Sequence, residues 1–215
     1  GELHPLMIAP PSMPASAERR RLRRVMRARR RALDPRALRA AADGLAASLA
    51  RGLRGPWPKR IAAYLARDGE IDPAPFARRL ARRGCALYLP RIDPLAGGSD
   101  RMRFAPWQAG APMTRNRFGI GEPSTPSTVP AWTLDVVLVP LVAFDRAGGR
   151  LGMGGGFYDR TFAALRPTPR RPLLVGVAHA LQEVPHVPMA GHDVALDAVA
   201  TEREFLPLRH RRTGP

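Results

Sequence analysis

The chain contains one cysteine, Cys85, and one lysine, Lys59, among 215 residues. A single cysteine excludes an internal disulfide and is typical of a reducing compartment, so we expect a cytoplasmic protein. No apolar run reaches the roughly 18 to 20 residues that a membrane-spanning helix needs, so we expect no membrane partner. The histidines have no zinc-ligand spacing, and no Gly-x-Ser-x-Gly motif occurs. A zinc cluster, a cysteine nucleophile and serine hydrolysis are therefore not expected.

Acidic residues are scarce relative to basic ones. The chain has 35 Lys and Arg against 18 Asp and Glu, which gives a formal net charge of +17. The preference for arginine over lysine is typical of a GC-rich coding sequence, but it does not account for the excess of cations over acids. A solvated basic surface and a surface that binds a polyanion both fit this composition.

The length and the 45% hydrophobic content predict one domain with a substantial core. Residues 1–17 are rich in proline and lack periodicity, so we interpret them as a tag remnant plus a disordered arm. We expect the single domain to span residues 18–205 and a basic tail to span residues 206–215.

Helical and strand signals alternate along that domain. The first expected helix, residues 18–33, has an apolar stripe beside a ladder of Arg19, Arg23 and Arg27. Asp34 and Pro35 are start signals for a second helix. Residues 110–132 read as a long irregular connection, a length that is usually functional or mobile. Further helices are expected over 73–83 and 157–165, and strands over 60–66, 85–92, 102–107, 134–145, 172–180 and 194–202.

This alternation predicts an α/β fold, a three-layer Rossmann-like domain whose largely parallel central sheet has helices on both faces. The segment 134–145 is apolar on both faces, as a central strand should be. Ligands of such sheets bind at the carboxyl ends of the strands.

A glycine-rich segment, "GGRLGMGGGFYDR" (148–160), follows that central strand and holds six glycines. Glycine suits positions where the backbone needs positive φ or where a ligand approaches the main chain. Backbone N–H groups around Gly152, Gly154 and Gly156, with the start of the next helix, are suited to an anion such as phosphate. The segment has neither the Walker nor the dinucleotide spacing. A glycine-rich surface loop therefore remains the alternative to a phosphate-binding loop.

Three carboxylates lie at expected strand ends or at the start of a helix. Asp159 follows the glycines, Asp193 lies in "GHDVALD", and Glu70 lies in "YLARDGEIDP". Mg²⁺ bound to phosphates needs only one or two carboxylates, which suits Asp159 and Asp193. Helix capping or a surface turn is the alternative for both. Glu70 is suited to reading a polar substrate or to a solvated turn.

Five segments in order resemble the 5-formyltetrahydrofolate cyclo-ligase family, also called 5,10-methenyltetrahydrofolate synthetases. They are "RLRR", "YLARDGEID", "RFGIGEP", "VPLVAFDRAGGRLGMGGGFYDR" and "VPHVPMAGHDVALDAVATE", and the match extends over about residues 19–202. The resemblance implies a C–N bond-forming ligase that uses ATP and Mg²⁺ to convert 5-formyltetrahydrofolate to 5,10-methenyltetrahydrofolate. It implies release of ADP and phosphate through a phosphorylated formyl intermediate.

The resemblance also implies roles for individual residues. Arg150 and Asp159 would be catalytic, and Asp159 and Asp193 would hold Mg²⁺. The folate site would include Leu65, Glu70, Met153 and Phe157. The residues that would bind ATP are Arg19, Arg23, Arg150, Leu151, Gly152, Met153, Gly154, Gly155, Gly156, Phe157 and Tyr158.

The sequence departs from the family at two of these positions. The family often has lysine at the position of Arg19 and a tyrosine pair where this chain has Phe157 and Tyr158. Arginine presents a planar fork rather than a point charge, so the phosphate contact would differ in geometry. The loss of a hydroxyl group at Phe157 puts one hydrogen bond in doubt.

The leading hypothesis is therefore a monomeric cyclo-ligase without a nucleic-acid partner. The alternative is a nucleotide-dependent RNA-binding, polyanion-binding or regulatory protein that uses the arginines of 19–31. A nicotinamide-linked reductase is disfavoured because the dinucleotide glycine spacing is missing.

Overall fold

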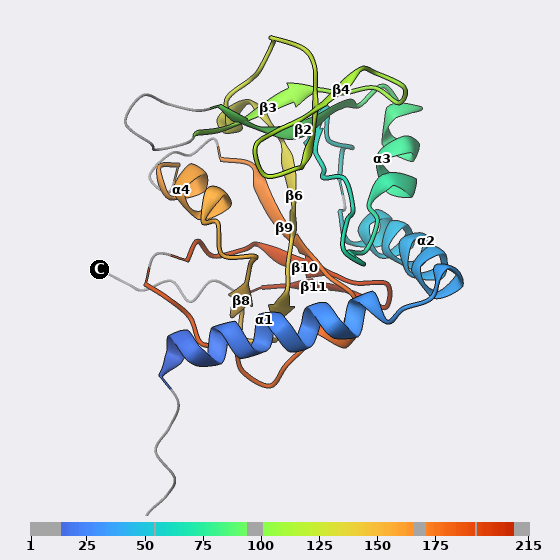
Figure 1. Cartoon of the computed structure of the whole chain (residues 1–215). Helices are drawn as coiled ribbons and strands as arrows, with labels where there is room; N and C mark the ends of the chain where they lie inside the picture. The colour runs from blue at the N-terminus through green and yellow to red at the C-terminus, as the bar shows by residue number, and fades with distance from the viewer. Residues whose placement is uncertain (1–13, 54, 94–100, 166–170, 192, 209–215) are drawn as a thin grey trace, which may run out of the picture.

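A seven-stranded sheet forms the centre of the computed structural model, which describes residues 14–53, 55–93, 101–165, 171–191 and 193–208 (Figure 1). From one edge to the other, the strands are β11 (Phe205–Pro207), β10 (Ala198–Ala200), β9 (Leu173–Val177), β6 (Val136–Pro140), β1 (Arg60–Ala62), β2 (Ala86–Asp93) and β3 (Arg101–Pro106). The inner strands β10, β9, β6, β1 and β2 are parallel to one another. The edge strands β11 and β3 are antiparallel to their neighbours. The largely parallel sheet expected from the sequence is therefore confirmed.

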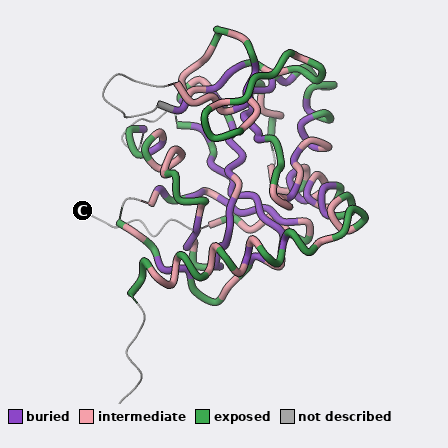
Figure 2. Tube along the Cα trace, in the orientation of Figure 1, coloured by how far each residue is buried: buried purple, intermediate pink, exposed green. Residues whose placement is uncertain are grey.

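Helices pack on both faces of this sheet, as the three-layer prediction requires. On one face, α2 (Pro35–Gly52) and α3 (Ala74–Ala81) bury Leu45, Leu49 and Phe76 in one core. On the other face, α4 (Phe157–Ala163) buries Phe162 in a second core. In Figure 2 the buried residues concentrate along the central strands between these layers.

The first helix, α1 (Ala15–Arg31), occupies a different position from the other three. Figure 1 shows it crossing the edge of the sheet at which the arrowhead of β6 ends. Its apolar residue Met26 joins Val142, Leu151 and Val187 in a third, smaller core. The helix therefore places its arginines at the carboxyl ends of the parallel strands, where ligands of α/β sheets bind.

The start of α2 agrees with the local signals of the sequence. The Asp34 side chain accepts a hydrogen bond from the backbone N–H of Ala37 at 2.7 Å, and Pro35 is in the first turn.

None of the described helices is both long and apolar enough to cross a bilayer.

The expected strand 134–145 is divided between two sheets. Leu141 still donates to Val177 of β9, but the Val142 N–H donates to Leu151 at 2.7 Å. The chain thus leaves the central sheet, and β7 (Ala143–Phe144) forms a small antiparallel sheet with β8 (Arg150–Leu151). The prediction of one continuous strand was wrong because both parts are apolar and buried.

The expected irregular connection, 110–132, contains regular structure. β4 (Met113–Arg115) and β5 (Gly121–Pro123) form an antiparallel hairpin, and a 3₁₀ turn, η1 (Ala131–Thr133), follows. The Asn116 side-chain oxygen accepts from the N–H groups of Phe118 and Ile120 at 2.9 and 3.0 Å. These hydrogen bonds to the Asn116 side chain close the turn of the hairpin.

Regular structure extends beyond both ends of the expected domain, residues 18–205. α1 begins at Ala15, within the segment interpreted as a disordered arm, and β11 extends into the expected basic tail as far as Pro207. Residues 1–13 and 209–215 lie outside the described part of the chain. The division into arm, domain and tail stays a prediction.

Candidate active site

The glycine loop connects β8 to α4 at the edge of the sheet where α1 lies. Gly154 and Gly156 have φ angles of 103° and 67°, which L-residues with side chains rarely adopt. Gly156 is the N-cap of α4. A Cβ built on Gly152 would meet no described atom within 4 Å. The main chain at Gly152 therefore borders open space, as close approach by a ligand requires.

Two arginines of α1 contact this region. Arg23 Nε donates to the carbonyl of Gly152 at 2.9 Å. Arg19 Nη1 donates to the carbonyl of Pro188 at 2.7 Å and to Asp193 at 2.9 Å. Burial lowers the pKa of Arg23, and the positive charge of Arg19 lowers it further. The structure thus brings Arg19, Arg23, Gly152 and Asp193 together.

Arg150 and Asp159 form an ion pair in which Arg150 is buried and Asp159 is partly exposed. The Arg150 side chain is 5% exposed, its Nη2 contacts Asp159, and its Nε donates to the carbonyl of Val194 at 2.7 Å. Asp159 also accepts from the Val194 N–H at 2.9 Å. The pair therefore joins β8 and α4 to the segment around Val194. Arg150 stabilises the glycine loop here, and its contact with phosphate stays a prediction.

Asp193 lies in the same charged region. It accepts from Arg19 and from the Ala190 N–H at 2.8 Å. Burial raises the pKa of Asp193, but these hydrogen bonds and the charges of Arg19 and Arg150 outweigh it, so the net pKa is lowered. Within the residues that the structure describes, no three or more His, Cys, Asp or Glu side chains form a metal-binding group.

Glu70 lies on the other side of the glycine loop, in the turn after β1. Its side chain is 8% exposed, and Oε1 is 3.5 Å from Arg30 Nη2. Burial raises the pKa of Glu70, and the charge of Arg30 opposes that shift. Tyr158 is partly buried nearby, and its pKa is raised by desolvation and by Glu70. Glu70 is therefore a buried acid in a cluster of polar side chains rather than a residue of a solvated turn.

Arg30 is a residue of this site that the sequence prediction missed. It is fully buried, and its Nε and Nη2 donate to the carbonyl and carboxylate of Asp68 at 2.8 and 3.0 Å. The same Nη2 is 3.9 Å from the sulfur of Met153. Arg30 occurs four residues after Met26 on the apolar stripe of α1. A charged residue on such a stripe was the available signal, because unpaired arginine is rarely buried.

An exposed apolar surface adjoins Glu70 and the glycine loop. Phe118 of the β4–β5 hairpin packs edge-on against Phe157, with ring centroids 5.6 Å apart. A Cβ on Gly121 would lie 3.6 Å from both Leu65 and Met113. Contiguous exposed apolar residues on a soluble protein indicate a binding surface. The exposed fractions are 40% for Leu65, 38% for Met113, 45% for Phe118 and 39% for Met153.

Comparison with known proteins identifies the family. Residues 15–202 match the sequence model of the 5-formyltetrahydrofolate cyclo-ligase family. The chain belongs to this family. The cyclo-ligase of Escherichia coli K12 is 40% identical over 143 residues, which cover 66% of this chain and 76% of that protein. The cyclo-ligase of Mycolicibacterium smegmatis is 34% identical over 157 residues, which cover 70% and 78%.

The solved structures agree with this assignment. The NMR structure of Aquifex aeolicus 5,10-methenyltetrahydrofolate synthetase matches with a TM-score of 0.73 at 28% identity, covering 92% of this chain and 96% of that one. The enzyme class and the α/β fold expected from the motifs are therefore confirmed.

The cyclo-ligase residues expected from the motifs form two neighbouring groups. The charged group contains Arg19, Arg23, Arg150, Asp159 and Asp193. The second group, around Glu70, contains Leu65, Met153 and Phe157, and the structure adds Arg30 and the β4–β5 hairpin. The glycine loop contributes to both groups, and the individual roles stay predictions.

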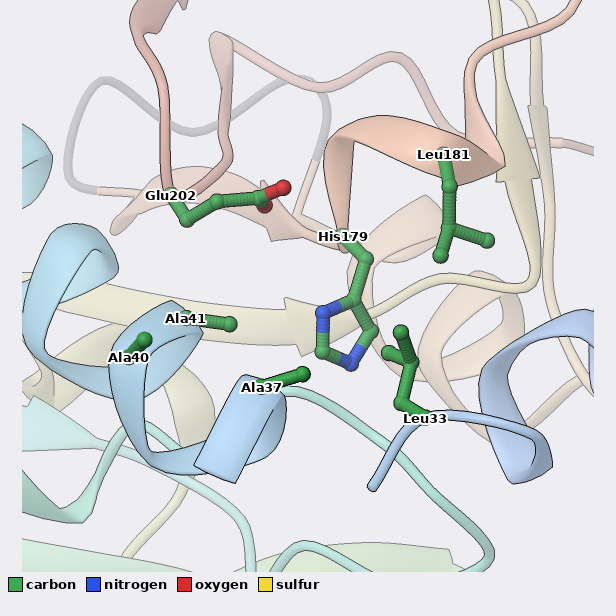
Figure 3. Close-up of a pocket in the computed structure, with 7 residues that line it drawn as sticks. All are labelled: Leu33, Ala37, Ala40, Ala41, His179, Leu181 and Glu202. Carbon is green, nitrogen blue, oxygen red and sulfur yellow. The ribbon is translucent and has the colours of Figure 1, made fainter. Parts of the chain in front are cut away.

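A separate cavity lies between the start of α2 and the segment around His179 (Figure 3). It has a volume of about 330 Å³, and the ring of His179 projects into it. His179 Nε2 is 3.0 Å from the carbonyl of Gly69, in the turn that carries Glu70. None of the predicted site residues lines the cavity, which is formed by Leu33, Ala37, Ala40, Ala41, His179, Leu181 and Glu202.

Proposed function

We propose that this protein cyclises 5-formyltetrahydrofolate to 5,10-methenyltetrahydrofolate, using ATP and Mg²⁺ and releasing ADP and phosphate. One observation carries the proposal: the glycine loop contacts two groups of side chains, a charged group on one side and, on the other, the Glu70 group with its exposed apolar neighbours. Arg23 reaches the loop at Gly152, and Met153 reaches the cluster around Glu70. A triphosphate bound on the first side and a folate on the second would meet at this loop.

The charged region suits a magnesium-bound triphosphate. Asp159 and Asp193 supply the oxygen donors that Mg²⁺ prefers, and phosphate oxygens and water would complete its shell. The ion would neutralise charge on the phosphates. Arg19 and Arg23 would donate to phosphate oxygens, with the open main chain at Gly152 beside them.

The apolar region suits the ring system of a folate. Leu65, Met113 and Phe118 offer exposed apolar surface, and Phe157 offers a ring at the end of the glycine loop. Glu70 is a buried acceptor that would hydrogen-bond the N–H groups of the pteridine. This combination of an apolar lining and a few polar groups is typical of small-molecule sites.

The chemistry then needs no covalent intermediate on the protein. The formyl oxygen attacks the γ-phosphorus, the bond from that phosphorus to the bridging oxygen of ADP breaks, and ADP leaves. N10 next attacks the activated formyl carbon, loses its proton, and expels inorganic phosphate. The formyl carbon is left bonded to both N5 and N10. Catalysis of this kind depends on positioning and on charge neutralisation, which arginines and backbone N–H groups provide.

The polyanion-binding alternative receives less support from the geometry. Arg19, Arg23 and Arg27 of the expected ladder all contact groups within the protein. Arg20, Arg21 and Arg24 are exposed on the same helix. If that surface binds RNA, affinity should fall steeply as salt rises.

The deciding experiment is a turnover assay with purified protein and 5-formyltetrahydrofolate. We expect the absorbance of the methenyl product only when ATP and Mg²⁺ are both present, with one ADP released per product. Matched reactions that lack ATP, or that contain EDTA, are the controls. Failure to form the product in the complete mixture, or equal formation without ATP, would contradict the proposal.

A further inference from the structure

The guanidinium group of Arg30 has one hydrogen-bonding nitrogen that the protein does not use. Nε and Nη2 are occupied by Asp68, and Nη2 also faces Glu70. Nη1 is buried and has no hydrogen-bond partner among the residues that the structure describes. Buried donors without partners are rare in native proteins, so each one calls for an explanation.

Asp68 accounts for the burial of the charge but not for the unused donor. Asp68 pairs with Arg27 and Arg31 as well as with Arg30, so its carboxylate is held by three guanidinium groups. A purely structural ion pair would be satisfied by the edge of Arg30 that carries Nε and Nη2. The remaining Nη1 is therefore available to a group that is not part of the protein.

The surroundings of Arg30 belong to the site proposed for folate. Its Nη2 is 3.5 Å from Glu70 Oε1 and 3.9 Å from the sulfur of Met153. Met153 is 39% exposed, and methionine is flexible and unbranched. A ligand that displaces the Met153 side chain would thus reach the carboxylate of Glu70 and the guanidinium of Arg30 together.

The pyrimidine edge of a reduced pteridine has a matching pattern. Its 2-amino group and N3–H are donors, and the adjacent 4-oxo group is an acceptor. An ionised carboxylate only accepts hydrogen bonds, and a guanidinium only donates them. Glu70 Oε2 accepts from the Arg67 N–H at 3.2 Å, and the carboxylate keeps further lone pairs for two donors beside the guanidinium of Arg30.

We propose that Arg30 is a specificity-determining residue: its Nη1 donates to the 4-oxo group of the substrate's pteridine while Glu70 accepts from the 2-amino group and N3–H. This inference rests on the proposed function and assigns Arg30 a substrate contact within it. Burial raises the net pKa of Glu70, and the charge of Arg30 limits that rise.

The test compares kcat/KM for 5-formyltetrahydrofolate with kcat/KM for its 4-amino-4-deoxy counterpart. The second compound keeps the formyl group and N10, but a donor replaces the 4-oxo acceptor and N3 loses its hydrogen, so the effect of the Arg30 variants on the preference isolates Arg30 from Glu70. We expect the wild-type protein to prefer the 4-oxo compound by at least about tenfold, the value of one hydrogen bond to a charged group. Arg30→Met should lower this preference by a similar factor, through the KM for folate and with the KM for ATP unchanged.

Two further variants separate recognition from folding. Arg27→Gln removes another guanidinium from Asp68 but does not touch Glu70 or Met153, so the preference should remain. Arg30→Lys keeps a positive charge near Glu70 without the fork of donors, and its preference should fall as in Arg30→Met. If Arg30→Met does not fold, Arg30→Lys carries the comparison with the wild-type protein.

The outcomes distinguish this inference from the proposed function. If the wild-type protein cyclises both compounds equally well, the role of Arg30 is refuted while the proposed activity holds. An equal loss of kcat/KM for both compounds in Arg30→Met would reveal a structural role only. If the wild-type protein forms no methenyl product from 5-formyltetrahydrofolate, both proposals fail.

Discussion

Arg23 offers the sharpest test of where ATP binds. In the structure its Nε donates to the carbonyl of Gly152 at 2.9 Å, and its guanidinium lies 3.4 Å from where a Cβ on Gly154 would be. We therefore expect Arg23→Ala to remove a positive charge and a hydrogen bond from the proposed phosphate site. A hydrogen bond that involves a charged group contributes about 1.5–3 kcal/mol. The corresponding loss in kcat/KM for ATP is roughly 10- to 150-fold.

The assay is steady-state formation of the methenyl product, with ATP varied at saturating folate and folate varied at saturating ATP. The KM for ATP should rise and the KM for folate should stay within about twofold, because Arg23 contacts the loop on its charged side. Arg24→Ala is the matched control, since it removes the same charge from an adjacent, exposed position of α1. A change confined to the KM for folate, or an equal change in Arg24→Ala, would refute the placement of ATP beside α1.

Two other variants test the charged groups of the site. Asp159→Asn keeps an oxygen that can accept from the Val194 N–H but loses the charge opposite Arg150. The kcat should fall at least tenfold, with little change in the circular dichroism spectrum. Near-normal turnover would contradict a metal-binding role. Asp68 has a pKa of about 2, because three arginine hydrogen bonds outweigh the effect of burial, against an ordinary value of 3.8. Its stabilising charge should be fully present above about pH 4 and lost toward pH 2. The free energy of unfolding of the wild-type protein should then fall more steeply over that interval than that of Asp68→Asn, and parallel curves would exclude this linkage.

Short-range sequence signals predicted the start of α2, the parallel sheet and the position of the glycine loop. Asp34 and Pro35 predicted the start of α2, and the side chain of Asp34 makes the expected capping bond. Alternation of apolar segments with helical ones predicted the parallel sheet, because each crossover needs a helix between strands. The glycine loop was located by composition, since positive φ at Gly154 and Gly156 is a backbone requirement.

Features that depend on distant partners could not be predicted in the same way. The β4–β5 hairpin is attached to β2 by Glu122, which accepts from the Ile92 N–H at 2.8 Å and from the Asn116 side chain at 2.7 Å. The residues around Glu122 in the sequence do not indicate that it pairs with Ile92 of β2. The sequence placed Arg150 beside the glycine loop but could not show that its side chain is buried against Asp159 and Val194. Burial of a charge follows from the tertiary partner that pairs with it.

Two ion pairs compensate the charges of the proposed site for magnesium and triphosphate. Arg19 pairs with Asp193, and Arg150 pairs with Asp159, so each proposed metal ligand is held by a guanidinium. An unpaired buried charge would be costly, whereas a pair compensates both members. Binding of magnesium-ATP would then exchange partners, because phosphate oxygens replace the carboxylates around Arg19 while the cation replaces the guanidinium at Asp193. Such an exchange would conserve the number of compensated charges.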